Sequence, residues 1–419
     1  MNLDKFTRCI IYSKRLKASM LPTVLLISIL IALISMALIG VAYYQRLLRT
    51  RDRTAHELRR NAYSALGYLL ASKQLTTTQP LIFDLYGEGK DSVEILKKHW
   101  GFFDMGIVQT FRGSHHQFIT ALLGNQPDSI AKSALYLPDE NRPLAIAGNT
   151  HLKGRLYVPQ GTVRSAFVDS RGFTGTAPVV DQLRKSRTTL PLLSDEFTHR
   201  LHHYQTKSGL PIQTLPAVLH QSFLAETLTY TSSESMVITG QISGNIILHG
   251  DQTLIISRQA QLRDIIVVAR KIIVQTGFVG NLQVLARDTL QVESGCRFNY
   301  PSILCTGGRD TKCYLSIGEG SMIDGLVIAS SDIPNVLENI VEFGQNTLIT
   351  GQVYVKGMVQ AKGNIHGNMV SQRLFLSTPS AFYENHLFDA QIDVNKRPKA
   401  FLTSPILSNA PTRILQWLD

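Results

Sequence analysis

The chain has 419 residues, of which 44% are hydrophobic and 17% are charged. This composition excludes an intrinsically disordered protein and a disulfide-dense miniprotein. The net charge of +11 does not indicate nucleic-acid binding, because residues 1–60 carry +8 of it and the rest of the chain only +3. A nucleic-acid surface would need that excess on a folded domain, so no nucleic-acid partner is expected.

A short basic tail, residues 1–19, precedes an apolar segment, residues 20–44, that contains no charged residue. At about 1.5 Å per residue, a helix of this length crosses the ~30 Å hydrocarbon core of a bilayer. The segment is longer than the apolar part of a signal peptide and is followed by no small-residue cleavage site. We therefore expect a retained, single-pass transmembrane helix. Basic residues stand on both sides of it, so charge does not give the orientation.

Residues 45–76 are expected to continue this helix as a membrane-proximal stalk, because no glycine or proline interrupts them before Gly67. Leu48, Ala55, Ala62 and Leu69 recur every seven residues, which places them on one helix face. That face can pack either on a partner helix or on the protein's own domain.

The order of a basic tail, a small-residue step at 17–19, a long apolar helix and an amphipathic continuation resembles type IV pilin-like and minor-pilin-like membrane anchors. The resemblance covers about residues 14–75. It implies a cytoplasmic N-terminus and lateral packing of the 20–70 helix against protein partners. The chain lacks the prepilin cleavage motif, since Ala18-Ser19-Met20-Leu21 stands where the family has a glycine before the cleavage point and a glutamate soon after it.

Residues 77–147 contain short β-rich runs separated by Gly, Asp and Ser, which predict a small strand-rich meander domain. Residues 162–236 have a different residue pattern and are predicted to be a mostly helical insertion, broken by Pro191, Pro211 and Pro216.

Residues 237–380 repeat the pattern apolar-x-Gly-x-apolar-x-apolar, beginning at Ile242, Ile349 and Ile365, with a close variant at Ile323. The step between the copies at 349 and 365 is 16 residues, which is too short for a helical repeat or a propeller blade. The pattern predicts a short-coil, single-stranded β-helix, and an ordinary antiparallel sandwich is the alternative. Glycine is expected where the chain bends between strands. The repeat-turn glycines are Gly154, Gly244, Gly325, Gly351 and Gly367.

A further copy of the pattern begins at Leu152, far upstream of the others. Residues 148–161 are therefore predicted to form an early coil of the same β-helix, with 162–236 inserted after it. Residues 381–419 are predicted to be a C-terminal capping tail.

The stretches "ITGQISGNIILHGDQTLII" and "LITGQVYVKGMVQAKGNIHGNMV" resemble the bactofilin-like, polymer-forming cytoskeletal β-helix proteins. The resemblance covers about residues 237–376. It implies a β-helix fold and self-association, and it is compatible with a membrane-tethered scaffold that faces the cytoplasm.

The sequence contains no motif for phosphate binding, a nucleophilic serine or a zinc protease, so no catalytic residue, cofactor or enzymatic activity is expected. His199, His202 and His203 are weak candidates for a metal site, but a solvated helix face explains them better. Cys305 and Cys313 bracket a turn-rich loop and are candidates for a disulfide outside the cytoplasm, with buried thiols as the alternative.

Together these features predict a membrane-anchored structural or assembly protein of the bacterial cell envelope, such as a minor component of a pilus-like or secretion apparatus. Its N-terminus is expected in the cytoplasm and its C-terminal domain in the periplasm or outside the cell. Two alternatives stay open: a carbohydrate-binding or carbohydrate-cleaving surface β-helix, and the cytoplasm-facing scaffold. Acidic or aromatic side chains along one groove would favour the first alternative. Asp264 and Asp324 are the acids at equivalent repeat positions.

Overall fold

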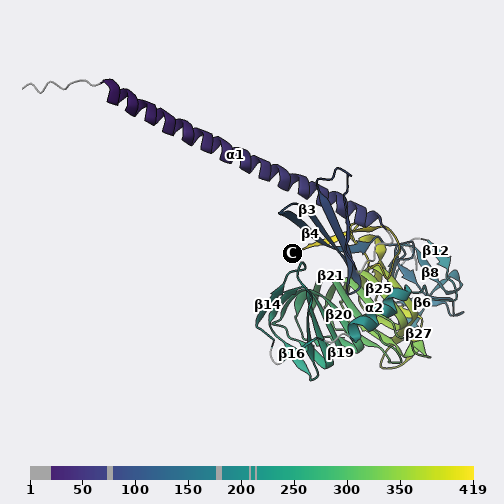
Figure 1. The fold of residues 1–419 in the computed structure, drawn as a ribbon. Coiled ribbons are helices and arrows are strands. Elements are labelled where there is room, and N and C mark those ends of the chain that lie inside the picture. Colours follow the sequence, from purple (N-terminus) through teal and green to yellow (C-terminus); the bar gives the residue numbers. More distant parts are fainter. Residues whose placement is uncertain (1–19, 73–78, 176–181, 207–208, 213–214) are drawn as a thin grey trace, which may run out of the picture.

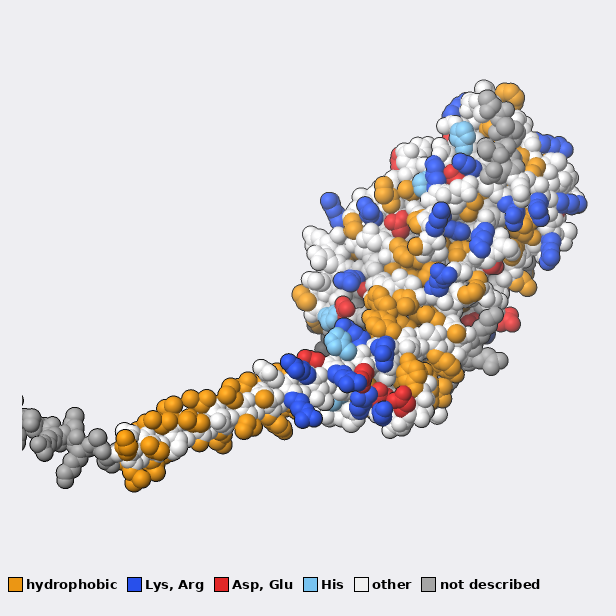
Figure 2. Space-filling view, turned by 90° about the horizontal axis from the view of Figure 1, so that it is seen from above, with side chains coloured by type: hydrophobic (Ala, Val, Ile, Leu, Met, Phe, Trp, Pro, Cys, Tyr) orange, Lys and Arg blue, Asp and Glu red, His pale blue; other side chains and the backbone are white. Residues whose placement is uncertain are grey.

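The computed structural model describes residues 20–72, 79–175, 182–206, 209–212 and 215–419, so the basic tail lies outside the described residues. The chain is mainly β and begins with one long helix, α1 (Met20–Ala71), which projects from the folded part (Figure 1). Among the described residues, α1 is the one helix that is long and apolar enough to cross a membrane. Residues 20–50 of α1 are all exposed, and Figure 2 shows this part as an apolar rod with Lys and Arg side chains where it meets the domain.

The last turns of α1 pack on an antiparallel sheet with the order β1-β2-β3-β4-β30. The apolar contact joins Ala62, Leu66 and Leu69 of the helix to the sheet, and the Thr110 hydroxyl donates a hydrogen bond of 2.9 Å to the Leu58 carbonyl. The predicted meander within 77–147 is confirmed for its first four strands. The strands are β1 (Leu81–Phe83), β2 (Ser92–Trp100), β3 (Phe103–Arg112), β4 (His115–Asn125) and β30 (Thr412–Leu418).

A closed barrel of parallel strands makes up most of the remaining chain. Side chains from alternate strand positions, almost all Ile, Leu, Val and Phe, fill its interior. The central strands are β17 (Gln241–Gly244), β18 (Ile246–Ile256), β19 (Gln261–Val274), β20 (Val279–Val292), β21 (Arg297–Thr306), β22 (Tyr314–Ile317), β23 (Met322–Ala329), β24 (Ile340–Phe343), β25 (Leu348–Ala361) and β26 (Asn364–Ser377).

Short strands close both ends of the barrel. At one end lie β13 (Leu210–Pro211), β14 (Val218–Gln221), β15 (Leu228–Ser232) and β16 (Met236–Ile238). At the other end lie β5 (Leu135–Tyr136), β7 (His151–Lys153), β8 (Leu156–Val158), β12 (Leu183–Lys185), β27 (Phe382–Glu384) and β29 (Gln391–Asp393). Beside this second end are the parallel sheet of β28 (His386–Phe388), β6 (Leu144–Ala147) and β9 (Val163–Ser165), and the hairpin of β10 (Phe167–Val168) and β11 (Arg171–Gly172).

The repeated glycines lie in register on neighbouring strands. Gly325 pairs with Gly351, which pairs with Gly367, and their φ angles are +151°, +150° and +158°. A Cβ atom on Gly351 would lie 1.9 Å from the carbonyl oxygen of Gly325. Glycine is therefore required at this position both by the backbone angle and by the close approach of the next strand.

The copy of the pattern at Leu152 joins this barrel, but at the opposite end from the one expected. Leu152 pairs with Ile392, which pairs with Ile365, whereas the strands around 237–250 close the other end. The prediction of an early coil was wrong because the pattern specifies how a segment fits a barrel but not which segment lies next to it. Here β5 and β29, more than 250 residues apart, both pair with β26.

The prediction of a mostly helical insertion at 162–236 was also wrong. The described residues there contain one α-helix, α2 (Asp195–Gln205), and otherwise short strands. Pairing with a barrel edge outweighs local helix propensity, as when Leu228–Ser232 aligns with 246–250.

The C-terminal tail does not simply cap the barrel as expected. Residues 391–393 pair with the barrel end, but the chain then runs back along the barrel and adds β30 to the antiparallel sheet. A second apolar cluster fills the space between barrel, sheet and tail. Tyr354 points outward from β25 into this cluster and is 5% exposed, because α2 and the tail cover it.

Candidate functional site

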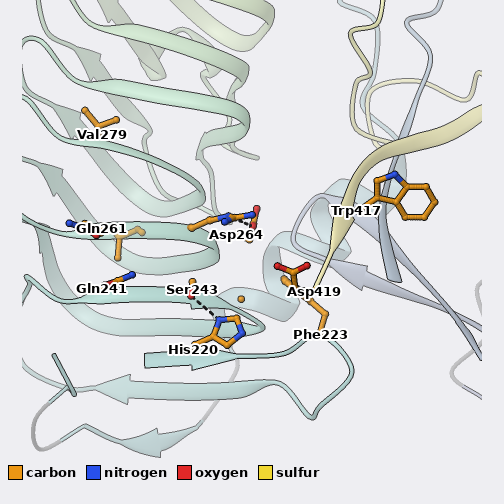
Figure 3. A pocket seen from close by; sticks show the side chains of 12 residues that line it. His220, Phe223, Gln241, Ser243, Gln261, Asp264, Val279, Trp417 and Asp419 are labelled. Carbon is orange, nitrogen blue, oxygen red and sulfur yellow. Dashed lines mark hydrogen bonds and ion pairs between the residues drawn. The ribbon is translucent and has the colours of Figure 1, made fainter. Parts of the chain in front are cut away.

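A cleft with a mixed polar and apolar lining lies between one side of the barrel and the C-terminal strand (Figure 3). Its volume is about 340 Å³, which is enough for part of a small ligand or for one unit of a polymer. The side chains that line it come from β14, β17, β19, β20 and the end of β30. They are His220, Phe223, Gln241, Ser243, Gln261, Leu262, Arg263, Asp264, Val279, Trp417 and Asp419.

The barrel wall of the cleft is a direct result of parallel pairing. Strands in register place side chains of the same face in rows, because the side-chain direction alternates along each strand. Gln241 lies beside Gln261, and His220 lies beside Ser243, which in turn lies beside Arg263. The result is two rows of polar side chains that point into the cleft.

His220 and Ser243 form the most chemically suggestive pair, with 2.9 Å between Nδ1 and Oγ. A serine nucleophile requires a histidine whose other ring nitrogen is held by a third group, usually a carboxylate. Within the described part of the chain, no carboxylate is hydrogen-bonded to His220. The pair is therefore a cross-strand hydrogen bond and does not complete a hydrolytic triad.

Asp264, the acid that the repeat pattern singles out, is held in place by neighbours. Its carboxylate accepts hydrogen bonds from Asn281 Nδ2 and Gln416 Nε2, both at 3.0 Å, and it lies 3.3 Å from Arg263 Nε. The Gln416 contact fastens β30 to the barrel. A carboxylate occupied in this way shapes the cleft, whereas glycoside hydrolysis needs two acids at a set separation across a substrate. Asp324 does not line this cleft.

Trp417 borders the cleft from β30, but its half-exposed indole points away from the barrel (Figure 3). It pairs with Ala121, whose side chain packs against α1, and its ring meets Tyr63 of α1 edge-on, with 5.9 Å between the ring centroids. The indole is therefore turned away from a ligand in the cleft, and the polar rows of the barrel form the lining that a ligand would meet.

Sequence reasoning missed both Trp417 and the pairing of His220 with Ser243. The short, largely apolar run Ile414-Leu415-Gln416-Trp417-Leu418 is a strand signal that could have placed Trp417 on a sheet. Its partner strand is nearly 300 residues away, however, and no local pattern indicates that pairing.

The three histidines named as weak metal candidates lie on α2 and all are exposed. Nowhere in the described ranges do three or more His, Cys, Asp or Glu side chains come together as a metal site. All five repeat-turn glycines, Gly154, Gly244, Gly325, Gly351 and Gly367, have positive φ angles.

The expected disulfide is not formed. Cys305 and Cys313 are free, and they are 0% and 1% exposed. Burial raises the pKa of Cys313 to about 12 and the pKa of Cys305 well above its usual range. Both residues therefore act as small apolar side chains, which was the alternative to the disulfide.

Family models, curated proteins and solved structures were compared with this chain, and none of them matches it. The interpretation of its function therefore depends on the fold and on the chemistry of its surfaces.

Proposed function

We propose that the protein is a membrane-anchored structural or assembly protein of the bacterial cell envelope, such as a minor component of a pilus-like or secretion apparatus. The observation that carries this proposal is the division of α1 into two parts. Residues 20–50 are exposed and largely apolar, whereas Leu58, Leu66 and Leu69 are buried on the antiparallel sheet.

The continuity of α1 favours a retained anchor over a cleaved signal sequence. The exposed apolar segment and the segment that packs on the sheet belong to one unbroken helix, Met20–Ala71. A signal peptidase acts on an extended, small-residue site, which this helix does not offer between its two parts.

We also propose that the parallel barrel is a single-stranded β-helix. The supporting observation is that successive strands pair in parallel with strands a few tens of residues further on, as in the series Ile323, Ile349 and Ile365. One uninterrupted apolar column fills the interior. This arrangement is compatible with the resemblance to bactofilin-like proteins and with self-association or partner binding through one barrel face.

The pilin-like interpretation of the N-terminal part gains support from the packing of α1. A long helix whose second part lies on an antiparallel sheet leaves its first part free for a membrane or for lateral contacts with other helices. In our proposal, the exposed part of this helix, residues 20–50, provides those contacts, and the barrel is carried on the far side of the cytoplasmic membrane.

Topology is the decisive test, and the structure improves its design. Ser233 is exposed at the barrel end, while Cys296, Cys305 and Cys313 are at most 1% exposed. A Ser233→Cys, Cys9→Ser variant therefore presents one accessible thiol to a membrane-impermeant maleimide. Labelling after permeabilisation of the outer membrane alone supports the envelope role. Labelling only after the inner membrane is broken rejects it and favours the cytoplasmic scaffold. The Cys9→Ser chain is the control for background labelling.

A further inference from the structure

A second cleft, of about 570 Å³, lies where the barrel end meets the start of β30. Three separate segments contribute cations to it: Lys132 from the loop after β4, Arg397 and Lys399 from the tail, and Arg413 from β30. No aspartate or glutamate lines this cleft. The sequence alone does not indicate this cleft, because its four cations are spread over more than 280 residues.

Arg397 is the central cation of this cleft. Its Nη1 donates a hydrogen bond of 2.8 Å to the Ala131 carbonyl, and its guanidinium lies 5.2 Å from the centre of the Phe401 ring. Burial lowers the pKa of Arg397 to about 10. Among the described residues, no carboxylate forms an ion pair with it, in contrast to Arg112, which contacts both Glu57 and Asp91.

The other three cations are also without carboxylate partners in the described part of the chain. Arg413 meets only the neutral Gln126, whose amide oxygen can accept from Nε at 2.8 Å. The nearby acids are occupied by their own backbone: Asp128 accepts from the Ile130 and Ala131 amides, and Asp393 accepts from the Asn395 amide. Because these acids form no ion pair with the four cations and none of them lines the cleft, the lining itself carries an excess of positive charge.

We propose that this cleft binds a multiply charged, phosphate-bearing anion. Four cations gathered around a partly enclosed space repel one another and focus a positive potential, which an anion with two or more charges would relieve. The planar fork of Arg397 suits two oxygens of a phosphate group, and Lys132 and Lys399 supply point charges around it.

The position of the cleft indicates a ligand other than a headgroup of the anchoring membrane. Arg112, at the membrane-proximal end of β3, contacts Glu57 of α1 and pairs with His115 at the start of β4. The cleft lies past Asn125, at the other end of β4. Eleven residues of antiparallel strand span roughly 35 Å, so the phosphate must come from a soluble molecule or a polymer.

Calorimetry on the full chain in a neutral detergent tests this inference, with inorganic pyrophosphate as the probe. We expect saturable binding that Arg397→Gln and, independently, the exposed Lys399→Gln each weaken by about tenfold. Arg297→Gln, an exposed arginine on the barrel side, is the matched control and should bind as the unmodified chain does. The far-ultraviolet circular dichroism of each variant verifies that it is folded.

Three results would overturn the proposal. The first is the absence of pyrophosphate binding, and the second is equal weakening by Arg297→Gln. The third is citrate binding as tight as pyrophosphate binding, since the cleft would then select charge and not phosphate. Binding of phosphatidylglycerol in mixed detergent micelles that Lys399→Gln weakens, without binding of pyrophosphate, would move the ligand to a lipid headgroup and also reject the soluble source. None of these results depends on the membrane topology, so this proposal and the proposed function can fail separately.

Discussion

Arg200 of α2 lies 2.7 Å from Asp104 of β3, Nη2 to Oδ1, and the two side chains are 2% and 3% exposed. Lys97 and His99 also contact this carboxylate, each at 3.0 Å, and Arg200 donates a further hydrogen bond to the Phe103 carbonyl. The cluster joins the antiparallel sheet to the helix that lies on the barrel. It therefore fixes the position of the antiparallel sheet relative to the barrel.

Replacing Asp104 with asparagine should destabilise the protein strongly. The change keeps the shape of the side chain but removes the carboxylate that Lys97 and Arg200 share, and it leaves Arg200 with Glu196 alone, at 2.8 Å. Removing one partner of a buried ion pair costs about 3 kcal/mol. Urea unfolding of the detergent-solubilised chain measures the loss. Glu88→Gln removes one partner of the exposed Lys90 pair and should have no measurable effect. Equal effects of the two changes would show that the Asp104 cluster does not stabilise the fold.

The same carboxylate predicts a pH dependence. Burial by itself would raise the pKa of Asp104, but the His99 hydrogen bond and the charges of Arg200 and Lys97 outweigh burial and hold the pKa well below its usual value. Because the folded pKa is lower than the unfolded value of about 3.9, the stabilisation is complete above about pH 5 and is lost as the pH falls below about 4.

The free-energy difference between the unmodified chain and Asp104→Asn should therefore be constant from about pH 5 to 7 and shrink by up to about 1.4 kcal/mol per pH unit below about 4. A difference that grows on acidification would contradict the assignment.

The stacked glycines give a prediction about the barrel. Gly351→Ala places a Cβ atom within the contact distance of the Gly325 carbonyl and forces alanine into a positive φ. Strain of this kind costs on the order of 1–3 kcal/mol for the backbone angle alone, and the overlap adds to it. Thermal unfolding followed by circular dichroism measures the effect. Gly67→Ala is the control, because no atom lies within 4 Å of its added Cβ. Gly67 lies inside α1, about one turn before its end at Ala71, where alanine should be neutral or stabilising.

The sequence was sufficient for features that depend on local pattern. The span at 20–44, the meander strands and the turn glycines each follow from spacing within a few residues, as in the glycines at 325, 351 and 367. Features that depend on distant pairing were not predictable. Three contacts join segments that lie far apart in the chain. Leu152 pairs with Ile392, Trp417 pairs with Ala121, and Lys132 lines the same cleft as Arg397. A repeat pattern tells which segments fit a ladder, but their order in the ladder is decided by the connections between them.

The packed part of α1 predicts a contrast between two leucines of one helix. Leu66 is 1% exposed against the sheet, whereas Leu48 is 40% exposed. Leu66→Ala should lower the free energy of unfolding by roughly 2–5 kcal/mol, through lost apolar burial and the cavity left behind. Leu48→Ala should leave it unchanged. Limited proteolysis of the β1–β2 region provides a second measurement, since a loosened helix exposes that edge of the sheet. Similar proteolysis of both variants would mean that α1 does not support the sheet.

The buried thiols give the last prediction. With a pKa of about 12, Cys313 is a thiolate in on the order of one molecule in ten thousand at pH 8, and burial protects Cys305 and Cys296 in the same way. A Cys9→Ser chain should therefore not react with a thiol reagent while folded. After unfolding in urea, it should react with three equivalents of the thiol reagent, one for each remaining cysteine. Mass spectrometry of peptides from the protein, isolated without reductant, tests whether the thiols are free. A peptide crosslinked between residues 305 and 313 would show that the two sulfurs are joined in the cell, and that the loop between them is held by a disulfide and not by packing.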